Sequence, residues 1–148
     1  MTGARVLVVD DDVANAIFIR DLLADWGYEP AVAYSADHAL AVARERALDA
    51  LITDLRMPDV DGFALIRQLR AADPAVAVIA ITAFGSSESG GRALEAGAHT
   101  YLTKPFQPDL LEERLRQVLE RRAVRLKNER LRHAVDQVLG DTEPRRKP

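Results

Sequence analysis

The stretch "LVVDDDVAN", residues 7–15, joins an apolar run to three consecutive aspartates, Asp10, Asp11 and Asp12. The apolar run is typical of a buried strand, whereas adjacent carboxylates repel one another. Two carboxylates about 4 Å apart repel by about 4 kcal/mol at an effective dielectric constant near 20. Such a cluster is costly unless a cation compensates it, so the stretch predicts a buried strand that ends in a charged site.

Apolar runs and amphipathic segments alternate along the first two thirds of the chain. The apolar runs are residues 5–9, 30–34, 50–53, 76–82 and 100–103. The amphipathic segments, with apolar residues recurring at three and four, are residues 13–27, 35–47, 62–72 and 86–98. This alternation predicts an α/β fold with a parallel sheet covered on both faces. We expect a doubly wound, five-stranded sheet of flavodoxin-like order 2-1-3-4-5, followed by an extended C-terminal helix.

Single residues mark some of the expected helix ends. Ser35 and Asp61 are candidate N-caps for the helices that follow them, because their side chains can accept from free backbone N–H groups. Gly27 is placed to end the first helix in a left-handed conformation. These positions set the boundaries of the predicted helices.

Composition narrows the class of protein. The 148 residues suffice for one domain and an appendage, and the absence of cysteine excludes disulfides and thiolate metal sites. The N-terminal residues lack the pattern of a signal peptide, and no apolar run is long enough to cross a bilayer. We therefore expect a cytoplasmic protein without a membrane partner.

Charge is distributed unevenly along the chain. Residues 1–106 hold nine basic and fifteen acidic residues, whereas residues 107–148 hold eleven basic and eight acidic ones. In the second part the signs alternate, which is typical of a solvated helix face rather than a clustered nucleic-acid patch. We expect no direct nucleic-acid binding from this segment.

Polar residues follow the apolar runs where parallel strands would end. Asp10, Asp11, Asp54, Thr82 and Lys104 should share one edge of the sheet, because the carboxyl ends of parallel strands meet there. Taken singly, such residues are commonly turn formers, strand residues or solvated charges. Together their oxygens suit a hard cation, Mg²⁺ or Mn²⁺, and zinc is a poor fit without cysteine or a nearby histidine. With a lysine and a hydroxyl beside it, this set favours phosphoryl transfer. Asp12, which directly precedes a helix, is better explained as a cap.

Four motifs carry a resemblance to a known family. "VLVVDDD", "LITDLRMPDVDG", "VIAITAFGS" and "EAGAHTYLTKPF" together resemble the receiver domain of bacterial two-component response regulators. The resemblance implies that Asp54 accepts a phosphoryl group from the phosphohistidine of a sensor kinase. It also implies that Asp11, Asp54 and the backbone carbonyl of Arg56 bind Mg²⁺ directly, and that Asp10 acts through a metal-bound water.

The same resemblance assigns roles around the phosphoryl group. Lys104 would pair with one phosphoryl oxygen, Thr82 would donate to another, and Ala83 would keep the approach open. Tyr101 would be the aromatic switch that turns inward with Thr82; its alternative is a boundary tyrosine on the last strand. The Lys104–Pro105 peptide bond would be cis.

The C-terminal third predicts one long helix. Residues 108–140 contain no internal breaker, and Leu111, Leu115, Val118 and Leu119 should pack on the sheet. Beyond them, residues 119, 123 and 126 form one apolar stripe, and residues 131, 135 and 138 form another that is out of register with the first. We expect a receiver domain over 1–122, a dimerisation or linker helix over 123–139 and a disordered tail over 140–148.

Gly90 and Gly91 lie near the start of the helix expected over residues 86–98. Each glycine costs a helix roughly 1 kcal/mol relative to alanine, so this end should fray. We hypothesise that the weakness serves switching, because the resemblance places the output face on this helix, the last strand and the last helix. Simple tolerance of glycine at an exposed helix start is the alternative.

Three functions remain in competition. The leading one is a phosphorylation-controlled switch that is not a dedicated enzyme, with a sensor histidine kinase or phosphotransfer protein as partner and a homodimer through the output face or the C-terminal helix. A haloacid-dehalogenase-like phosphohydrolase is an alternative, because Asp10-x-Asp12 resembles that family's nucleophile motif, although Ala14 departs from it and Asp54 would be unexplained. A pseudo-receiver that binds partners without phosphorylation is the third.

Overall fold

The computed structural model describes residues 3–56, 62–82 and 87–142, and its elements alternate between strands and helices. In chain order they are β1 (Arg5–Val9), α1 (Val13–Asp25), β2 (Glu29–Ala33), α2 (Ala36–Glu45), β3 (Ala50–Asp54), α3 (Gly62–Ala72), β4 (Ala77–Thr82), α4 (Ser87–Ala96), β5 (Thr100–Thr103) and α5 (Pro108–Thr142). The expected strands are confirmed to within one residue at each end. Helix α3 has the expected bounds, and α1, α2 and α4 are two to three residues shorter than expected.

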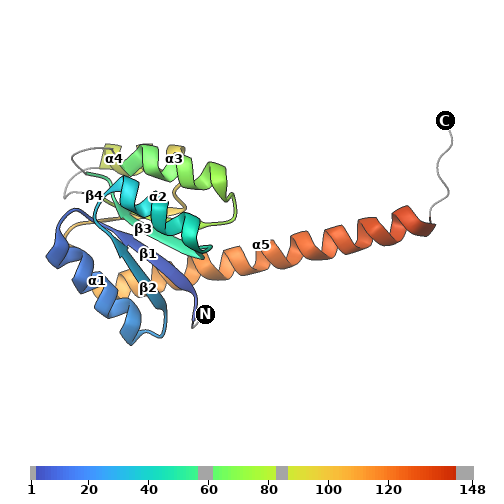
Figure 1. The fold of residues 1–148 in the computed structure, drawn as a ribbon, viewed down its shortest axis with the longest axis horizontal. Helices are drawn as coiled ribbons and strands as arrows, with labels where there is room; N and C mark the ends of the chain where they lie inside the picture. Colours follow the sequence, from blue (N-terminus) through green and yellow to red (C-terminus); the bar gives the residue numbers. More distant parts are fainter. Residues whose placement is uncertain (1–2, 57–61, 83–86, 143–148) are drawn as a thin grey trace.

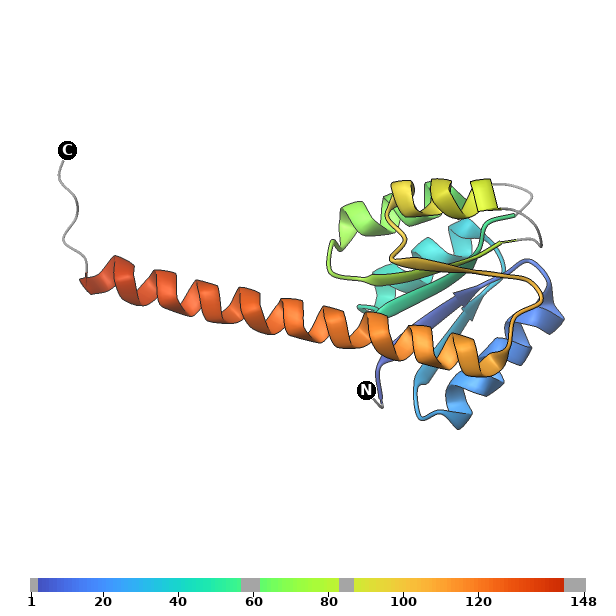
Figure 2. The same cartoon turned by 180° about the vertical axis from the view of Figure 1, so that it is seen from behind.

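Within the described residues the strands form one parallel sheet of order β2-β1-β3-β4-β5, as expected. Helices α1 and α5 cover one face, and α2, α3 and α4 cover the other (Figures 1 and 2). Because successive strand residues point to opposite faces, Val6 and Val8 join the core under α1 and α5, whereas Leu7 and Val9 join the core under α2 to α4. The buried strand next to the aspartates is therefore apolar on both sides.

The helix caps in the described residues agree with those predicted from the sequence. The Asp12 carboxylate accepts from Asn15 N at the start of α1, and the Ser35 hydroxyl accepts from His38 N at the start of α2. Gly27 has φ of +93°, the left-handed conformation expected after α1. The other expected cap, Asp61, lies outside the described residues.

Helix α5 is 35 residues long and extends well past the sheet (Figure 1). Its first half packs on the core through the expected residues, since Leu111, Leu115, Val118 and Leu119 are at most 3% exposed. The helix ends at Thr142, so it includes Gly140, where the sequence predicted the start of a disordered tail. A single glycine costs a helix about 1 kcal/mol and does not by itself end it. Residues 143–148 of the expected tail lie outside the described residues.

Among the described residues, no helix combines the length and the hydropathy that a membrane crossing requires.

Candidate functional site

The carboxyl ends of β1, β3, β4 and β5 bring the predicted polar residues to one edge of the sheet. Asp10 directly follows β1, Asp54 and Thr82 are the last residues of β3 and β4, and Lys104 directly follows β5. Asp10, Asp54 and Thr82 are only 2%, 8% and 3% exposed. Buried polar groups at strand ends need specific partners, so their contacts define the site.

Three carboxylates form the centre of this site. Asp10, Asp11 and Asp54 each offer an oxygen, and these oxygens all lie within 4.8 Å of one another. Asp11 is exposed, whereas the other two are buried. The donor set consists of carboxylate oxygens beside the ends of β1 and β3, two of them from buried acids, which fits a hard divalent cation such as Mg²⁺ or Mn²⁺.

Lys104 provides the positive charge within the protein. Its Nζ lies 3.1 Å from Asp54 Oδ2 and 3.5 Å from Asp10 Oδ2. Burial lowers the pKa of Lys104, but the attraction of Asp54 and Asp10 outweighs it, so the pKa lies above its ordinary value. Lys104 therefore stays charged and links the two buried carboxylates.

Asp54 is subject to opposing influences. Burial raises the pKa of its carboxyl, and the negative charge of Asp10 raises it further. The Arg56 N–H, which donates to Oδ1 at 3.2 Å, and Lys104 lower it without cancelling the effect of burial. The pKa of Asp54 therefore lies above that of an ordinary aspartate, and added positive charge would favour its ionised form.

The contacts of Asp10 include a residue that sequence reasoning missed. Its Oδ1 accepts from Asp12 N at 2.9 Å, and its Oδ2 accepts from Asn15 Nδ2 at 3.1 Å. Asn15 is the third residue of α1, from which an amide can reach back to the strand end. The sequence did contain a signal for this contact, because an asparagine stands in the first turn of the helix that follows the acidic end of β1.

Gly62 is a second residue whose role was not predicted. Its N donates to Leu55 O at 3.1 Å, and a Cβ at this position would lie 2.6 Å from Asp54 O and 2.7 Å from Leu55 Cα. Because those atoms are backbone, they cannot rotate away. The first residue of α3 must therefore be glycine for the helix to pack against the end of β3.

Tyr101 lies on β5 beside α4. Its ring packs partly into the core under α2 to α4, and a Cβ on Gly90 would lie 2.4 Å from its Cε2 and Cζ atoms. Arg114 donates to Thr100 Oγ1 at 2.6 Å and to Tyr101 O at 3.4 Å, which ties β5 to α5. The bare backbone of α4 at Gly90 thus provides the space that the tyrosine ring occupies.

Two other expectations concern the surroundings of the site. The Lys104–Pro105 peptide bond is cis, as the resemblance implied. Ala83 lies outside the described residues, and the Arg56 carbonyl as a metal ligand stays a prediction.

Comparison with known proteins agrees with this geometry. Residues 6–116 match the family model described as the response regulator receiver domain. The chain belongs to this family. The resemblance seen in the motifs is thereby confirmed, and neither the phosphohydrolase nor the pseudo-receiver alternative is favoured.

Relatives are found among regulators of several bacteria. The chain is 44% identical over 114 residues to the transcriptional regulatory protein ZraR of Salmonella typhimurium, which covers 77% of this receiver chain and 26% of ZraR. It is 39% identical over 122 residues to the transcriptional regulatory protein PrrA of Mycobacterium tuberculosis, which covers 82% of this chain and 52% of PrrA. The receiver chain therefore spans about a quarter to a half of these relatives.

Solved structures share the fold. The structure of NtrX from Brucella abortus in complex with ATP superposes with a TM-score of 0.85 at 30% identity, over 88% of this chain and 30% of NtrX. A putative response regulator from Chloroflexus aurantiacus gives a TM-score of 0.77 at 33% identity, over 80% of this chain and 99% of that one. Both solved structures thus share the fold of this chain over at least four fifths of its length.

Proposed function

We propose that this receiver accepts a phosphoryl group on Asp54 from the phosphohistidine of a sensor histidine kinase or a phosphotransfer protein. The observation that carries the proposal is Asp54 itself, a buried carboxylate at a strand end with Lys104 Nζ at 3.1 Å and two further carboxylates beside it. A structural ion pair would not need the third, exposed carboxylate of Asp11. This arrangement suits a phosphoacceptor.

In the proposed reaction a carboxylate oxygen of Asp54 attacks phosphorus and the bond from phosphorus to the imidazole nitrogen breaks. The electron pair of that bond stays on the imidazole, and the product is an aspartyl phosphate. Lys104 moves from Asp54 to a phosphoryl oxygen, and the Thr82 hydroxyl donates to another. Positioning and charge stabilisation account for most of the rate enhancement in such a transfer.

The cation would be held by Asp11, Asp54 and the Arg56 carbonyl, with Asp10 behind them. When bound, Mg²⁺ or Mn²⁺ supplies positive charge to the phosphoryl oxygens and offsets the repulsion among the carboxylates. Asn15 keeps Asp10 oriented toward the site, and Gly62 keeps the end of β3 in place.

The readout is conformational. Phosphorylation changes the positions of Thr82 and Tyr101 and thereby the face formed by α4, β5 and α5. A homodimer through this face or through the projecting part of α5 belongs to the same proposal, as do a receiver domain over 1–122, a helical extension over 123–139 and a cytoplasmic location. The chain takes part in its own phosphorylation and is not a dedicated enzyme.

Labelling tests the phosphoacceptor. The full chain is incubated with a small phosphodonor and Mg²⁺, and the covalent phosphoryl group is measured by intact mass with and without chelator. We expect one phosphoryl group per chain, lost in Asp54→Asn and strongly reduced by chelation. A label that survives Asp54→Asn but disappears in Asp10→Asn would support the phosphohydrolase, and no label in the wild type would support the pseudo-receiver.

A further inference from the structure

Helix α5 carries two apolar stripes, and the structure separates them. The stripe that includes Leu119 faces the receiver body, where Leu119 is 1% exposed and Leu126 is half-buried. The other stripe faces solvent: Val124, Leu131, Val135 and Val138 are 54–59% exposed. The two stripes are out of register in the sequence because one packs against the receiver body and the other is exposed to solvent.

The exposed stripe follows a heptad. Residues 124, 128, 131, 135 and 138 are separated alternately by four and three, which is the spacing of a coiled-coil seam. In this register Asn128 and Val135 occupy a positions, and Val124, Leu131 and Val138 occupy d positions. We call these five residues the seam.

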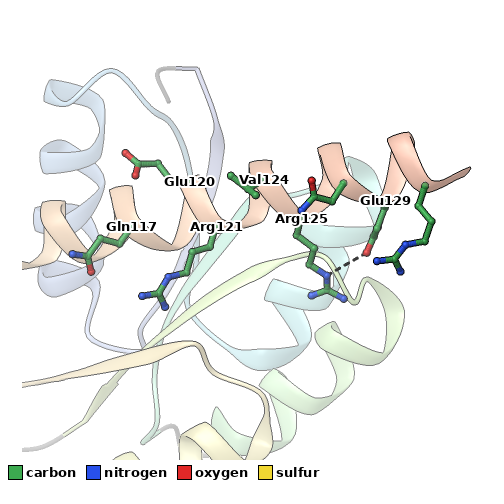
Figure 3. Close-up of a pocket in the computed structure, with 8 residues that line it drawn as sticks. Gln117, Glu120, Arg121, Val124, Arg125 and Glu129 are labelled. Carbon is green, nitrogen blue, oxygen red and sulfur yellow. Dashed lines mark hydrogen bonds and ion pairs between the residues drawn. The ribbon is translucent and has the colours of Figure 1, made fainter. Parts of the chain in front are cut away.

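The surface is hollowed along the seam. One groove, of about 710 Å³, is lined by eight α5 residues that include Arg121, Val124 and Asn128, and Figure 3 shows their side chains projecting from the helix. A second, of about 260 Å³, is lined by Leu131, Ala134, Val135, Val138 and Leu139, all apolar. These two grooves follow the positions that a second helix would contact in a coiled coil.

We propose that the seam binds the seam of a second copy of this chain, in parallel and in register, as a short two-stranded coiled coil. The proposal names the contact of the homodimer proposed above and rests on that dimer, but it is independent of phosphorylation at Asp54. Leu119 and Leu126 lie at f positions, on the side opposite the seam. A second helix can therefore lie along the seam without displacing the receiver body.

Asn128 decides the orientation. In a parallel, in-register pair its amide meets the amide of Asn128 in the second copy, and the two can hydrogen-bond. In an antiparallel pair it would face an apolar d residue and lose a partner. Val135 at a with Leu131 at d is the combination that favours two strands, and Asn128 at an a position also specifies the number of strands, whereas the valines at d positions 124 and 138 do not add to this preference.

The charges beside the seam set its strength. In the parallel register Glu120 at g faces Arg125 at e of the second copy, which is attractive, whereas Lys127 at g faces Arg132 at e, which is repulsive. The next pair, Ala134 and Leu139, is apolar. The seam thus contains one repulsive pair that a single substitution can reverse.

The mass of the full chain in solution, by light scattering or sedimentation, tests the seam. We expect a dimer that becomes a monomer at the same concentration in Leu131→Asp and in Val135→Asp. His133→Asp, at an exposed f position of the same helix, is the matched control and should stay dimeric. Because all three residues are exposed, helix content by circular dichroism should show a folded receiver body in each variant.

The orientation is tested by charge and by crosslinking. Lys127→Glu turns the repulsive pair into an attractive one in both halves of the dimer and should tighten it roughly tenfold. Because the chain has no cysteine, Val124→Cys and Val138→Cys introduce single thiols. Each variant alone should form an interchain disulfide under mild oxidation if the helices are parallel and in register.

Three results would overturn the proposal: a monomeric wild type, a dimer that survives Leu131→Asp and Val135→Asp, or a dimer in which neither Val124→Cys nor Val138→Cys alone forms an interchain disulfide. Asp54→Asn should dimerise like the wild type. Loss of labelling with an intact dimer, or the reverse, separates failure of the phosphoacceptor from failure of the seam.

Discussion

Gly62 illustrates how one residue controls the geometry of the site. Its missing side chain lets the start of α3 touch the backbone of residues 54 and 55, the first of which carries the buried carboxylate of Asp54. Gly62 belongs to one of the motifs that carry the family resemblance, but the motif does not say why glycine is needed there. The structure gives the reason, which is a close contact with the backbone of a residue eight positions earlier in the chain. Contacts of this kind fix where Asp54 points.

Replacing Gly62 by alanine should therefore destabilise the receiver. A Cβ at 2.6–2.7 Å from backbone atoms forces a shift of α3 or β3, and overpacking of this kind costs about 1–3 kcal/mol. Urea unfolding measures the loss, and labelling of Asp54 should slow. Gly91→Ala is the control: a Cβ there meets no atom within 4 Å, so this variant should not lower the unfolding free energy and should leave labelling of Asp54 unchanged. Equal effects of the two variants would refute this role.

His99 should make the folding stability of the receiver depend on pH. The Val78 N–H donates to His99 Nδ1 at 3.0 Å, which requires that nitrogen to be unprotonated. Partial burial of the ring and the charges of Arg70, Arg125 and Arg121 lower the pKa of His99. A lowered pKa means that the unfolded chain binds the proton more tightly, so this stabilisation is present above the ordinary pKa of about 6.5 and is lost as pH falls through the folded value.

The free energy of unfolding should consequently fall more steeply from neutral to acidic pH in the wild type than in His99→Asn. The asparagine amide oxygen can accept from Val78 without titrating in this range, so the variant isolates the histidine. Denaturant unfolding at a series of pH values measures both slopes, and NMR gives the pKa directly. Parallel pH profiles for the two proteins would contradict the assignment.

At the scale of elements, α4 combines a weak start with a specific contact. From the sequence, Gly90 and Gly91 were both predicted to weaken the helix in the same way. In the structure their surroundings differ: Gly90 lies against the Tyr101 ring, and Gly91 faces open space. Only Gly90 has a packing reason to be glycine. The coupling of α4 to β5 therefore depends on one of the two.

Gly90→Ala and Gly91→Ala should have opposite effects on α4. Gly91→Ala should stabilise the helix by about 0.5–1 kcal/mol and protect the amides of residues 87–92 from exchange. Gly90→Ala should push the Tyr101 ring away from α4, because the ring would lie 2.4 Å from the new Cβ, and NMR shifts of that ring should change. If residues 87–92 are as protected as α3 in the wild type and indifferent to phosphorylation, the switching hypothesis for this helix start fails.

At the scale of the whole molecule, the sheet and the charged edge were predictable because they follow from periodic patterns and from where parallel strands end. The contact of Asn15 with Asp10 and the close approaches at Gly62 and Gly90 were not, since they depend on how each helix is rotated on the sheet. The stripes of α5 were visible in the sequence, but docking decides which stripe is core and which is surface. Gly140 was misjudged because one glycine is a weak stop signal within a long helix.

The extent of the receiver body can be tested by truncation. Arg122 of α5 contacts the body closely: it pairs with Asp49 at 3.0 Å and donates to Ala75 O at 2.9 Å, and its side chain is 18% exposed. Arg125 donates to Pro74 O at the longer distance of 3.5 Å. Residues 127–139 are all exposed. A chain ending at Leu126 should thus keep the unfolding free energy of the monomeric full chain within about 0.5 kcal/mol, because little packing is removed.

A chain ending at Glu120 should be less stable by about 1–2 kcal/mol, since it loses the Arg122 hydrogen bond to Ala75 and the ion pair with Asp49. Both truncated chains should accept a phosphoryl group on Asp54, and neither should dimerise through the seam. Denaturant unfolding and sedimentation measure the two effects. A loss of several kcal/mol on ending the chain at Leu126 would mean that the projecting helix supports the body, and the boundary between receiver and extension would then lie further along α5.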